Sequence, residues 1–290
     1  MKRFIYSLLL LGGLFGTLSI ITHSCTDRQT DRKEQIDSAP ESKVKISNFD
    51  LKATTKSAEQ SYRLSIMGDT AFLTLSASVQ WPENIGGCDI KLFQDSIISL
   101  SFPRDIHKGE IDKSISSFVC DIDIMGDSVE FVPVASIPKE DLNERAYEIS
   151  VTGKLLEVTE AFVTYQVINY SYTGGAHPNT FSFPFTYALK DKKVLTMENM
   201  FKPGSEEALT QVVREALARQ YNVPAQHLTA AGLFSDNVPM SHNIYILNGA
   251  LIFHYNTYDI APYYMGAINA EVYPYEIEAY LTPMGVELFN

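Results

Sequence analysis

The chain has 290 residues, of which 45% are hydrophobic and 20% charged, and its formal net charge is −12. This composition excludes a wholly disordered protein, and the length suits one large domain or two small ones. The acidic charge opposes binding to nucleic acid, so no nucleic-acid partner is expected. It would attract a basic partner, or it serves solubility alone.

The first 24 residues have the pattern of a secretory signal peptide. Lys2 and Arg3 form a short basic start, and residues 4–21 are almost all apolar. A run of about 18 apolar residues can also span a bilayer, so a retained membrane anchor is the alternative. The small Ser24 directly before Cys25 favours cleavage between them. Loss of the two basic residues would take the formal charge from −12 to −14.

Cys25 and its neighbours resemble the lipobox of bacterial lipoproteins, in which the cysteine after the cleavage site is acylated. His23 departs from that pattern, which prefers a small or hydroxylated residue there. The resemblance implies a lipid anchor on Cys25, which is stable with two or more acyl chains. Thr26, in place of Asp, implies sorting to the outer membrane. Residues 25–45 are charged and polar, and we expect them to form a disordered tether.

Two further cysteines, Cys88 and Cys120, remain if Cys25 carries lipid. In an oxidising compartment they either form a disulfide or stay as unlinked buried thiols. A disulfide would close a loop of about 30 residues and contribute on the order of 3 kcal/mol. The sequence leaves both alternatives open.

Residues 61–187 alternate between strand and helix patterns. A β-hairpin is predicted over 61–81, with its turn at Gly68-Asp69. Further strands are predicted over 147–156, 162–172 and 181–187. Two amphipathic helices are predicted between the hairpin and these strands, because apolar residues recur there at helical spacing. These residues are Ile90, Phe93, Ile97 and Ile98 in the first helix and Ile111, Ile115, Phe118, Val119 and Ile122 in the second.

The last two of these strands are joined by the motif YTGGAHPNT, residues 172–180. Its glycines suit a tight turn with positive φ angles, and Pro178 restricts His177 to extended conformations. A rigidly held histidine at a loop tip can act as a base, a metal ligand or a recognition residue. The alternative is a turn whose imidazole bonds nearby backbone or packs on a tyrosine.

The C-terminal part predicts one clear helix and one further hairpin. The helix starts at Gly204-Ser205, and its apolar face recurs at helical spacing from Leu209 to Leu217. Strands over 244–247 and 251–255 flank Asn248-Gly249, a signal for a type I′ turn. A short helix is predicted over 275–281.

Eight of the 16 tyrosines follow Asn243, and several lie in the segment YNTYDIAPYYMG, residues 255–266. Tyrosine combines a rigid apolar face with a polar tip, which suits glycan stacking and protein interfaces. Tyrosines also fit a half-buried sheet surface, so a structural role is the alternative. If this segment lies beside the His177 loop, the two form one composite site. The candidate ligand-binding residues are His177, Tyr172, Tyr258, Asp259, Tyr263 and Tyr264.

No sequence motif identifies catalytic chemistry. The chain lacks the zincin, P-loop, dinucleotide-binding and nucleophile-elbow signatures, and its histidines have no standard zinc spacing. We therefore predict no catalytic residue, no metal and no cofactor. Acidic residues are numerous enough for a paired-carboxylate glycosidase, but no pair stands out.

Three motifs in the same order carry a family resemblance. They are YSYTGGAHP at 170–178, LTMENMFKPG at 195–204, and YDIAPYYMG at 258–266 followed by EVYPY. Together they resemble a bacterial extracytoplasmic family shared by the ectodomain of RsiV-type anti-sigma factors and the non-catalytic N-terminal region of PdaC-type deacetylases. The RsiV-type ectodomain is a receptor for lysozyme. The chain lacks counterparts of the sigma-binding segment and of the deacetylase catalytic domain, so neither function transfers directly.

The resemblance and the patterns together predict an α+β fold. Two adjoining modules, 46–187 and 188–290, are expected, each with an antiparallel sheet packed by amphipathic helices. The expected function is that of a lipid-anchored envelope protein, a non-enzymatic binding module for a lysozyme-like protein or a cell-wall glycan. A hydrolase acting on envelope polysaccharide is the alternative.

Overall fold

The computed structural model describes residues 45–46, 50–66, 69–105, 107, 109–121, 124, 130–133 and 145–290. The signal peptide, Cys25 and almost the whole tether lie outside these ranges, as do Gly68 and Ile122. Expectations about them stay predictions. Within the described ranges, no helix is long and apolar enough to cross a membrane.

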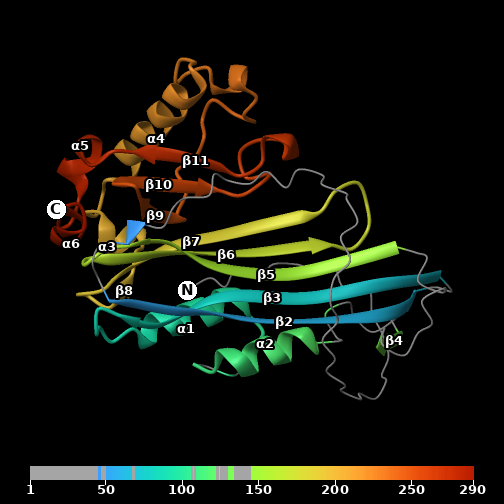
Figure 1. Cartoon of the computed structure of the whole chain (residues 1–290). Coiled ribbons are helices and arrows are strands. Elements are labelled where there is room, and N and C mark those ends of the chain that lie inside the picture. The colour runs from blue at the N-terminus through green and yellow to red at the C-terminus, as the bar shows by residue number, and fades with distance from the viewer. Residues whose placement is uncertain are drawn as a thin grey trace.

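Two sheets and several helices form the predicted α+β fold (Figure 1). The larger sheet has eight strands in the order β4-β2-β3-β5-β6-β7-β8, and β1 pairs with β5 beside this path. Its strands are β1 (Lys45–Ile46), β2 (Leu51–Ile66), β3 (Asp69–Ile85), β4 (Glu130–Pro133), β5 (Arg145–Val158), β6 (Phe162–Tyr172), β7 (Asn179–Ala188) and β8 (Lys193–Val194).

The large sheet is not wholly antiparallel, because β5 runs parallel to both β3 and β1. Between β3 and β5 the chain forms α1 (Lys91–Ser101) and α2 (Ile111–Val119), the two amphipathic helices that the sequence predicts. Both helices lie on one face of the sheet (Figure 1). The connection from β3 to β5 is a long crossover that also includes β4, and a crossover of this kind allows two strands to run parallel.

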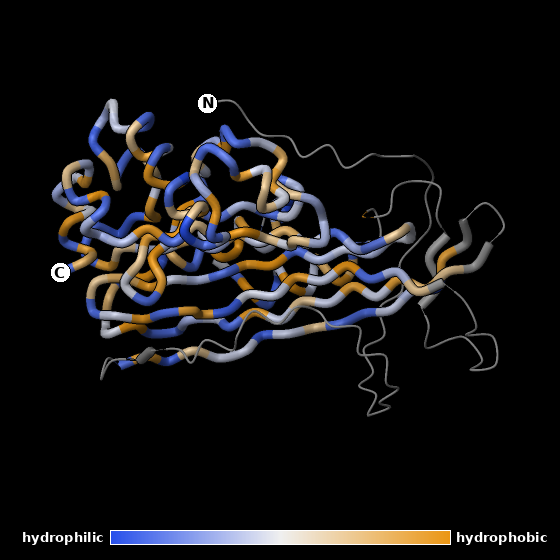
Figure 2. Tube along the Cα trace, turned by 90° about the horizontal axis from the view of Figure 1, so that it is seen from above, coloured by the Kyte–Doolittle hydropathy of each residue, from blue (hydrophilic) through white to orange (hydrophobic). Residues whose placement is uncertain are grey.

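The first hairpin is longer than its sequence pattern predicts. Pairing of β2 with β3 extends from Leu51 opposite Ile85 to Ile66 opposite Asp69. Residues 51–60 are mostly polar and only partly buried, so they carry no apolar alternation. Figure 2 shows hydrophobic and hydrophilic residues alternating along the strands. The buried apolar residues of β3 pack in the same hydrophobic clusters as residues of α1 and α2.

The C-terminal part lies on the opposite face of the large sheet from α1 and α2 (Figure 1). Its three-stranded antiparallel sheet consists of β9 (Ile244–Leu247), β10 (Ala250–Tyr255) and β11 (Ile268–Val272). The predicted helix is α4 (Glu206–Tyr221), which packs against β11. Asn248 and Gly249 both have positive φ, at 53° and 78°, which confirms the type I′ turn.

The chain end differs from its sequence pattern. The helix predicted over 275–281 is divided into α5 (Pro274–Ile277) and a 3-10 turn, Glu278–Tyr280. The sequence patterns do not predict β11 or several short elements. Besides β1, β4 and β8, these are α3 (Met197–Met200), the 3-10 turns Leu228–Ala231 and Tyr263–Met265, and α6 (Pro283–Glu287).

A closed ring of three hydrogen bonds joins the small sheet to the large one. The Ile246 amide of β9 donates to the Thr186 hydroxyl (2.8 Å), and the Thr164 hydroxyl donates to the Ile246 carbonyl (2.6 Å). The two threonine oxygens are 2.7 Å apart. Because Thr164 uses its proton on the carbonyl, Thr186 must donate to Thr164. Both threonines are completely buried, so they satisfy the free edge of β9 where water has no access.

Two more polar contacts cross the same junction. The buried Glu157 carboxylate accepts the Asn248 amide at 2.8 Å. The Asn256 side chain accepts the Ser182 amide at 2.6 Å and donates to the Ser182 carbonyl at 3.1 Å. An asparagine side chain therefore pairs with the edge of β7 as a neighbouring strand would.

Cys88 and Cys120 are both free thiols. They pack against different hydrophobic clusters, Cys88 with the residues around Phe93 and Cys120 with those around Leu73. Of the two alternatives that the sequence leaves open, the structure has the unlinked thiols and not the disulfide.

Replacing Thr186 by valine should lower the free energy of unfolding by about 1–3 kcal/mol, because the buried Ile246 amide would lose its acceptor. Chemical denaturation followed by circular dichroism measures the change. The control is Thr180→Val, an exposed threonine on the same strand. Equal effects of the two substitutions would show that the ring contributes nothing specific.

Candidate functional site

The His177 loop and the 255–266 segment meet, although they are far apart in the sequence. His177 Nε2 lies 3.1 Å from the Tyr258 hydroxyl. Its ring stacks on Tyr263, with centroids 3.7 Å apart and planes 17° from parallel. We call His177, Tyr258 and Tyr263 the aromatic cluster. It joins the β6–β7 loop to the loop between β10 and β11.

The hydrogen bonds of His177 determine which of its two ring nitrogens carries the proton. Nδ1 lies 3.0 Å from the carbonyl oxygen of Pro178, which can only accept. Nδ1 therefore carries the proton. In the neutral imidazole Nε2 is then an acceptor, and the Tyr258 hydroxyl donates to it. Gly174 and Gly175 have φ angles of 90° and 106°, which confirms the expected role of the glycines in this turn.

Tyr258 has an unusual backbone conformation. Its φ is 71°, in the left-handed region that bulky residues rarely adopt, and its side chain is 52% exposed. A left-handed conformation costs a non-glycine residue roughly 1–2 kcal/mol. Strain of this kind is concentrated at functional sites, where the surrounding structure maintains it.

Three further residues lie close to the aromatic cluster on the large sheet. Tyr170 and Tyr172 of β6 are half-buried, and Tyr172 donates a long hydrogen bond of 3.4 Å to the Gly175 carbonyl. The pKa of Tyr170 is raised, mainly by burial and further by the nearby Glu148, Tyr263 and Tyr172. Tyr170 thus lies near both Tyr263 and Glu148. Neither Tyr170 nor Glu148 is among the candidate residues that the sequence predicts. Knowledge of how β5 pairs with β6 would have identified these two residues, because Glu148 lies opposite Tyr172 and next to the row of Tyr170.

The other two candidate residues, Asp259 and Tyr264, lie around the aromatic cluster and do not contact His177. Asp259 is exposed, and its carboxylate accepts the Asn256 amide at 2.7 Å, so it stabilises the turn. Tyr264 is 79% exposed and lies next to Gly232. Phe234, 58% exposed, extends the same surface, since its amide donates to the Ile260 carbonyl. The sequence does not predict a role for Phe234, because a single phenylalanine outside any motif gives no indication that it lies near the site.

His254 is buried behind the site. Its Nδ1 lies 2.7 Å from the Asn269 side-chain oxygen, and its Nε2 lies 3.4 Å from that of Asn256. Burial lowers the pKa of His254 below its usual range, against opposing hydrogen bonds from the two asparagines. The neutral ring is favoured, and its single N–H, on Nδ1, donates to the Asn269 side-chain oxygen.

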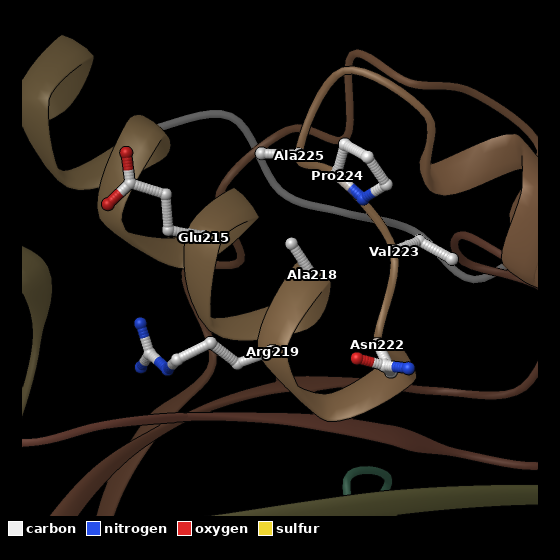
Figure 3. Close-up of a pocket in the computed structure, with 7 residues that line it drawn as sticks. All are labelled: Glu215, Ala218, Arg219, Asn222, Val223, Pro224 and Ala225. Atoms are coloured by element: carbon white, nitrogen blue, oxygen red, sulfur yellow. The ribbon is translucent and has the colours of Figure 1, made fainter.

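A shallow pocket lies elsewhere, at the end of α4 (Figure 3). Its two charged residues are Glu215 and Arg219, and Arg219 forms a two-pronged ion pair with Glu276 of α5. None of the residues that line it belongs to the aromatic cluster. Its lining residues are Glu215, Ala218, Arg219, Asn222, Val223, Pro224 and Ala225.

The described part of the chain offers no group of three or more potential ligands that would hold a metal ion. The hydrogen-bond partners of His177 are a backbone carbonyl and a phenol. Such an arrangement orients aromatic rings and presents hydroxyl groups. It suits recognition of a ligand more directly than activation of a nucleophile.

Two family models match separate parts of the chain. Residues 198–280 match the family described as "Protein of unknown function (DUF3298)", and residues 73–180 match "Deacetylase PdaC". Both matches agree with the family resemblance that the sequence motifs predicted, and each covers less than half of the chain. These two matches indicate an envelope-associated module.

Solved structures described as DUF3298 family proteins have a similar fold. A DUF3298 family member from Bacteroides fragilis NCTC 9343 has a TM-score of 0.59 at 20% identity, over 81% of this chain and 95% of that one. Another from Pseudomonas aeruginosa PAO1 has a TM-score of 0.51 at 14% identity, over 80% and 96%. At these identities the likeness concerns the fold.

A curated Mycobacterium tuberculosis protein described as an esterase is 32% identical over 101 residues. The match covers 34% of this chain and 43% of the relative. The chain therefore spans less than half the length of that protein.

Replacing Tyr258 by glycine should leave the free energy of unfolding unchanged or raise it by up to about 1 kcal/mol, because the left-handed strain disappears. Thermal and chemical denaturation measure this. A marked loss of stability would mean that the tyrosine is retained for folding and not for a ligand. Tyr258→Phe is the companion variant, since it keeps the strain and removes only the hydrogen bond to His177.

Proposed function

We propose that this protein is a non-enzymatic binding module of the cell envelope, and that its ligand is a cell-wall glycan. The observation that carries the proposal is the strained, half-exposed Tyr258, whose hydroxyl is directed to His177 beside the stacked Tyr263. Exposed rings with fixed orientation suit the apolar faces of sugars, and phenol groups suit their hydroxyls. Tyr172 and Tyr264 border the cluster and would extend the contact.

The proposal is tested with the mature chain in which Cys25 is replaced by alanine. Peptidoglycan fragments should bind, as measured by calorimetry, and His177→Ala or Tyr263→Ala should weaken binding at least tenfold, or about 1.4 kcal/mol. Tyr275→Ala is the matched control, because this tyrosine is 78% exposed but lies on α5. Equal losses in all variants, or no binding to any fragment, would contradict the proposal.

A basic protein is the competing ligand, because the chain is acidic and the resemblance includes a lysozyme receptor. Lysozyme is therefore the second probe in the same titrations. If it binds while peptidoglycan fragments do not, and the cluster variants abolish its binding, then the ligand is a protein.

A hydrolase acting on envelope polysaccharide is the second candidate function, favoured by the similarity to a protein described as an esterase. The purified chain is incubated with acetylated peptidoglycan and with a chromogenic acetyl ester. Turnover that disappears in His177→Ala would support this candidate. Turnover that is absent, or unaffected by that substitution, would exclude the cluster as its active site.

We further propose that Cys25 carries the lipid that anchors the protein, after removal of residues 1–24, and that the anchor lies in the outer membrane. The proposal rests on the sequence alone. Cys25→Ser should move the protein from the membrane fraction to the soluble fraction and abolish incorporation of labelled fatty acid. An unchanged membrane fraction would favour a retained signal segment as anchor.

A further inference from the structure

The face of the large sheet opposite α1 and α2 carries a polar ladder. Because side chains alternate along a strand, paired residues share a face, and the register defines rows across β2, β3, β5 and β6. We call the three rows next to the aromatic cluster the polar ladder. They are Ser61-Thr74-Glu148-Tyr172, Glu59-Ser76-Ser150-Tyr170 and Ser57-Ser78-Thr152-Ile168.

The ladder is open to a ligand. Its members are half-buried or exposed, and the hydroxyls of Ser61 and Thr74 lie 3.0 Å apart, which places them on the same face. The C-terminal module packs on this face at β6 and β7, through Thr164, Thr186 and Ser182. The ladder therefore begins where that module ends, beside Tyr263 and His177.

The charges at this edge are negative. Glu148 is exposed and lies in the same row as Tyr172, next to the row of Tyr170. Among the residues that the structure describes, no cation forms an ion pair with Glu148. The cations on this face are Arg63, on β2 beyond the first row, and Lys154, beyond the third row on β5. Neither lies in a row of the ladder.

We propose that the site takes a glycan that carries free amino groups, such as a de-N-acetylated amino-sugar chain. An ammonium group would lie at the Glu148 carboxylate and over the faces of Tyr170 and Tyr172, where charge-assisted hydrogen bonding and cation–π attraction add. Neighbouring sugar hydroxyls would bond to the hydroxyls of Ser150 and Thr74. The inference rests on the proposed glycan binding and specifies the class of glycan.

The hydroxyl ladder is what favours an amino sugar over a lysine side chain of a protein. A lone ammonium needs only the carboxylate and the rings. Serine and threonine hydroxyls both donate and accept, and they recur from strand to strand at about 4.8 Å. A chain of sugar residues with hydroxyls on each ring uses such a surface along its length.

The test compares two oligosaccharides of equal length, an N-acetylglucosamine hexamer and its fully de-N-acetylated counterpart. Binding is measured by calorimetry on the mature chain with Cys25→Ala, in mildly acidic buffer in which the amino groups are charged. The de-N-acetylated hexamer should bind about tenfold tighter. Glu148→Gln should bring that ratio close to one, while affinity for the acetylated hexamer stays within about twofold.

The matched control is Glu160→Gln, which removes the same charge from an exposed position after the other end of β5. It should keep the preference for the amine. Loss of the preference in both variants would attribute it to overall charge and overturn the inference. Equal binding of the two hexamers by the unmodified site would also overturn it, although glycan binding would stand. If neither hexamer nor any peptidoglycan fragment binds, the proposed function itself fails.

Discussion

The structure depends on how the free edge of β9 is satisfied. An edge strand packed against another sheet would leave its amide and carbonyl without partners, at a cost of several kcal/mol. Here Thr186 and Thr164 close a ring through the backbone of Ile246, so two sheets meet face to edge without an unpaired polar group. This ring fixes the small sheet laterally on β6 and β7.

The aromatic cluster is a product of that docking. His177 comes from the β6–β7 loop of the large sheet, and Tyr258 and Tyr263 come from the loop between β10 and β11 of the small sheet. Asn256, two residues before Tyr258, is bound to the edge of β7 through Ser182. The backbone is therefore fixed to the large sheet two residues before Tyr258. This attachment explains how the left-handed conformation of Tyr258 persists.

Local sequence patterns predicted most of the helices and strands. They did not predict how strands distant in the sequence pair with one another. The helices α1, α2 and α4 and the turn at Asn248 were predicted because spacing and glycine position specify them locally. The sequence also pointed to His177, Tyr258 and Tyr263, but their contact depends on two sheets docking. Residues 51–60 were missed because a strand that lacks a buried face has no alternation. Glu148 was missed because its neighbours are set by pairing between strands distant in sequence.

The aromatic cluster also has an implication for how proteins of this type are assembled from parts. The two family matches end at 180 and begin at 198, so His177 belongs to one and Tyr258 to the other. The intervening residues, 181–197, hold Ser182 and Thr186, the contacts that bring the two together. A gene that carries either matched region alone encodes only part of the cluster. Loss or exchange of one region in evolution would therefore remove this surface in a single event, with no substitution in the other.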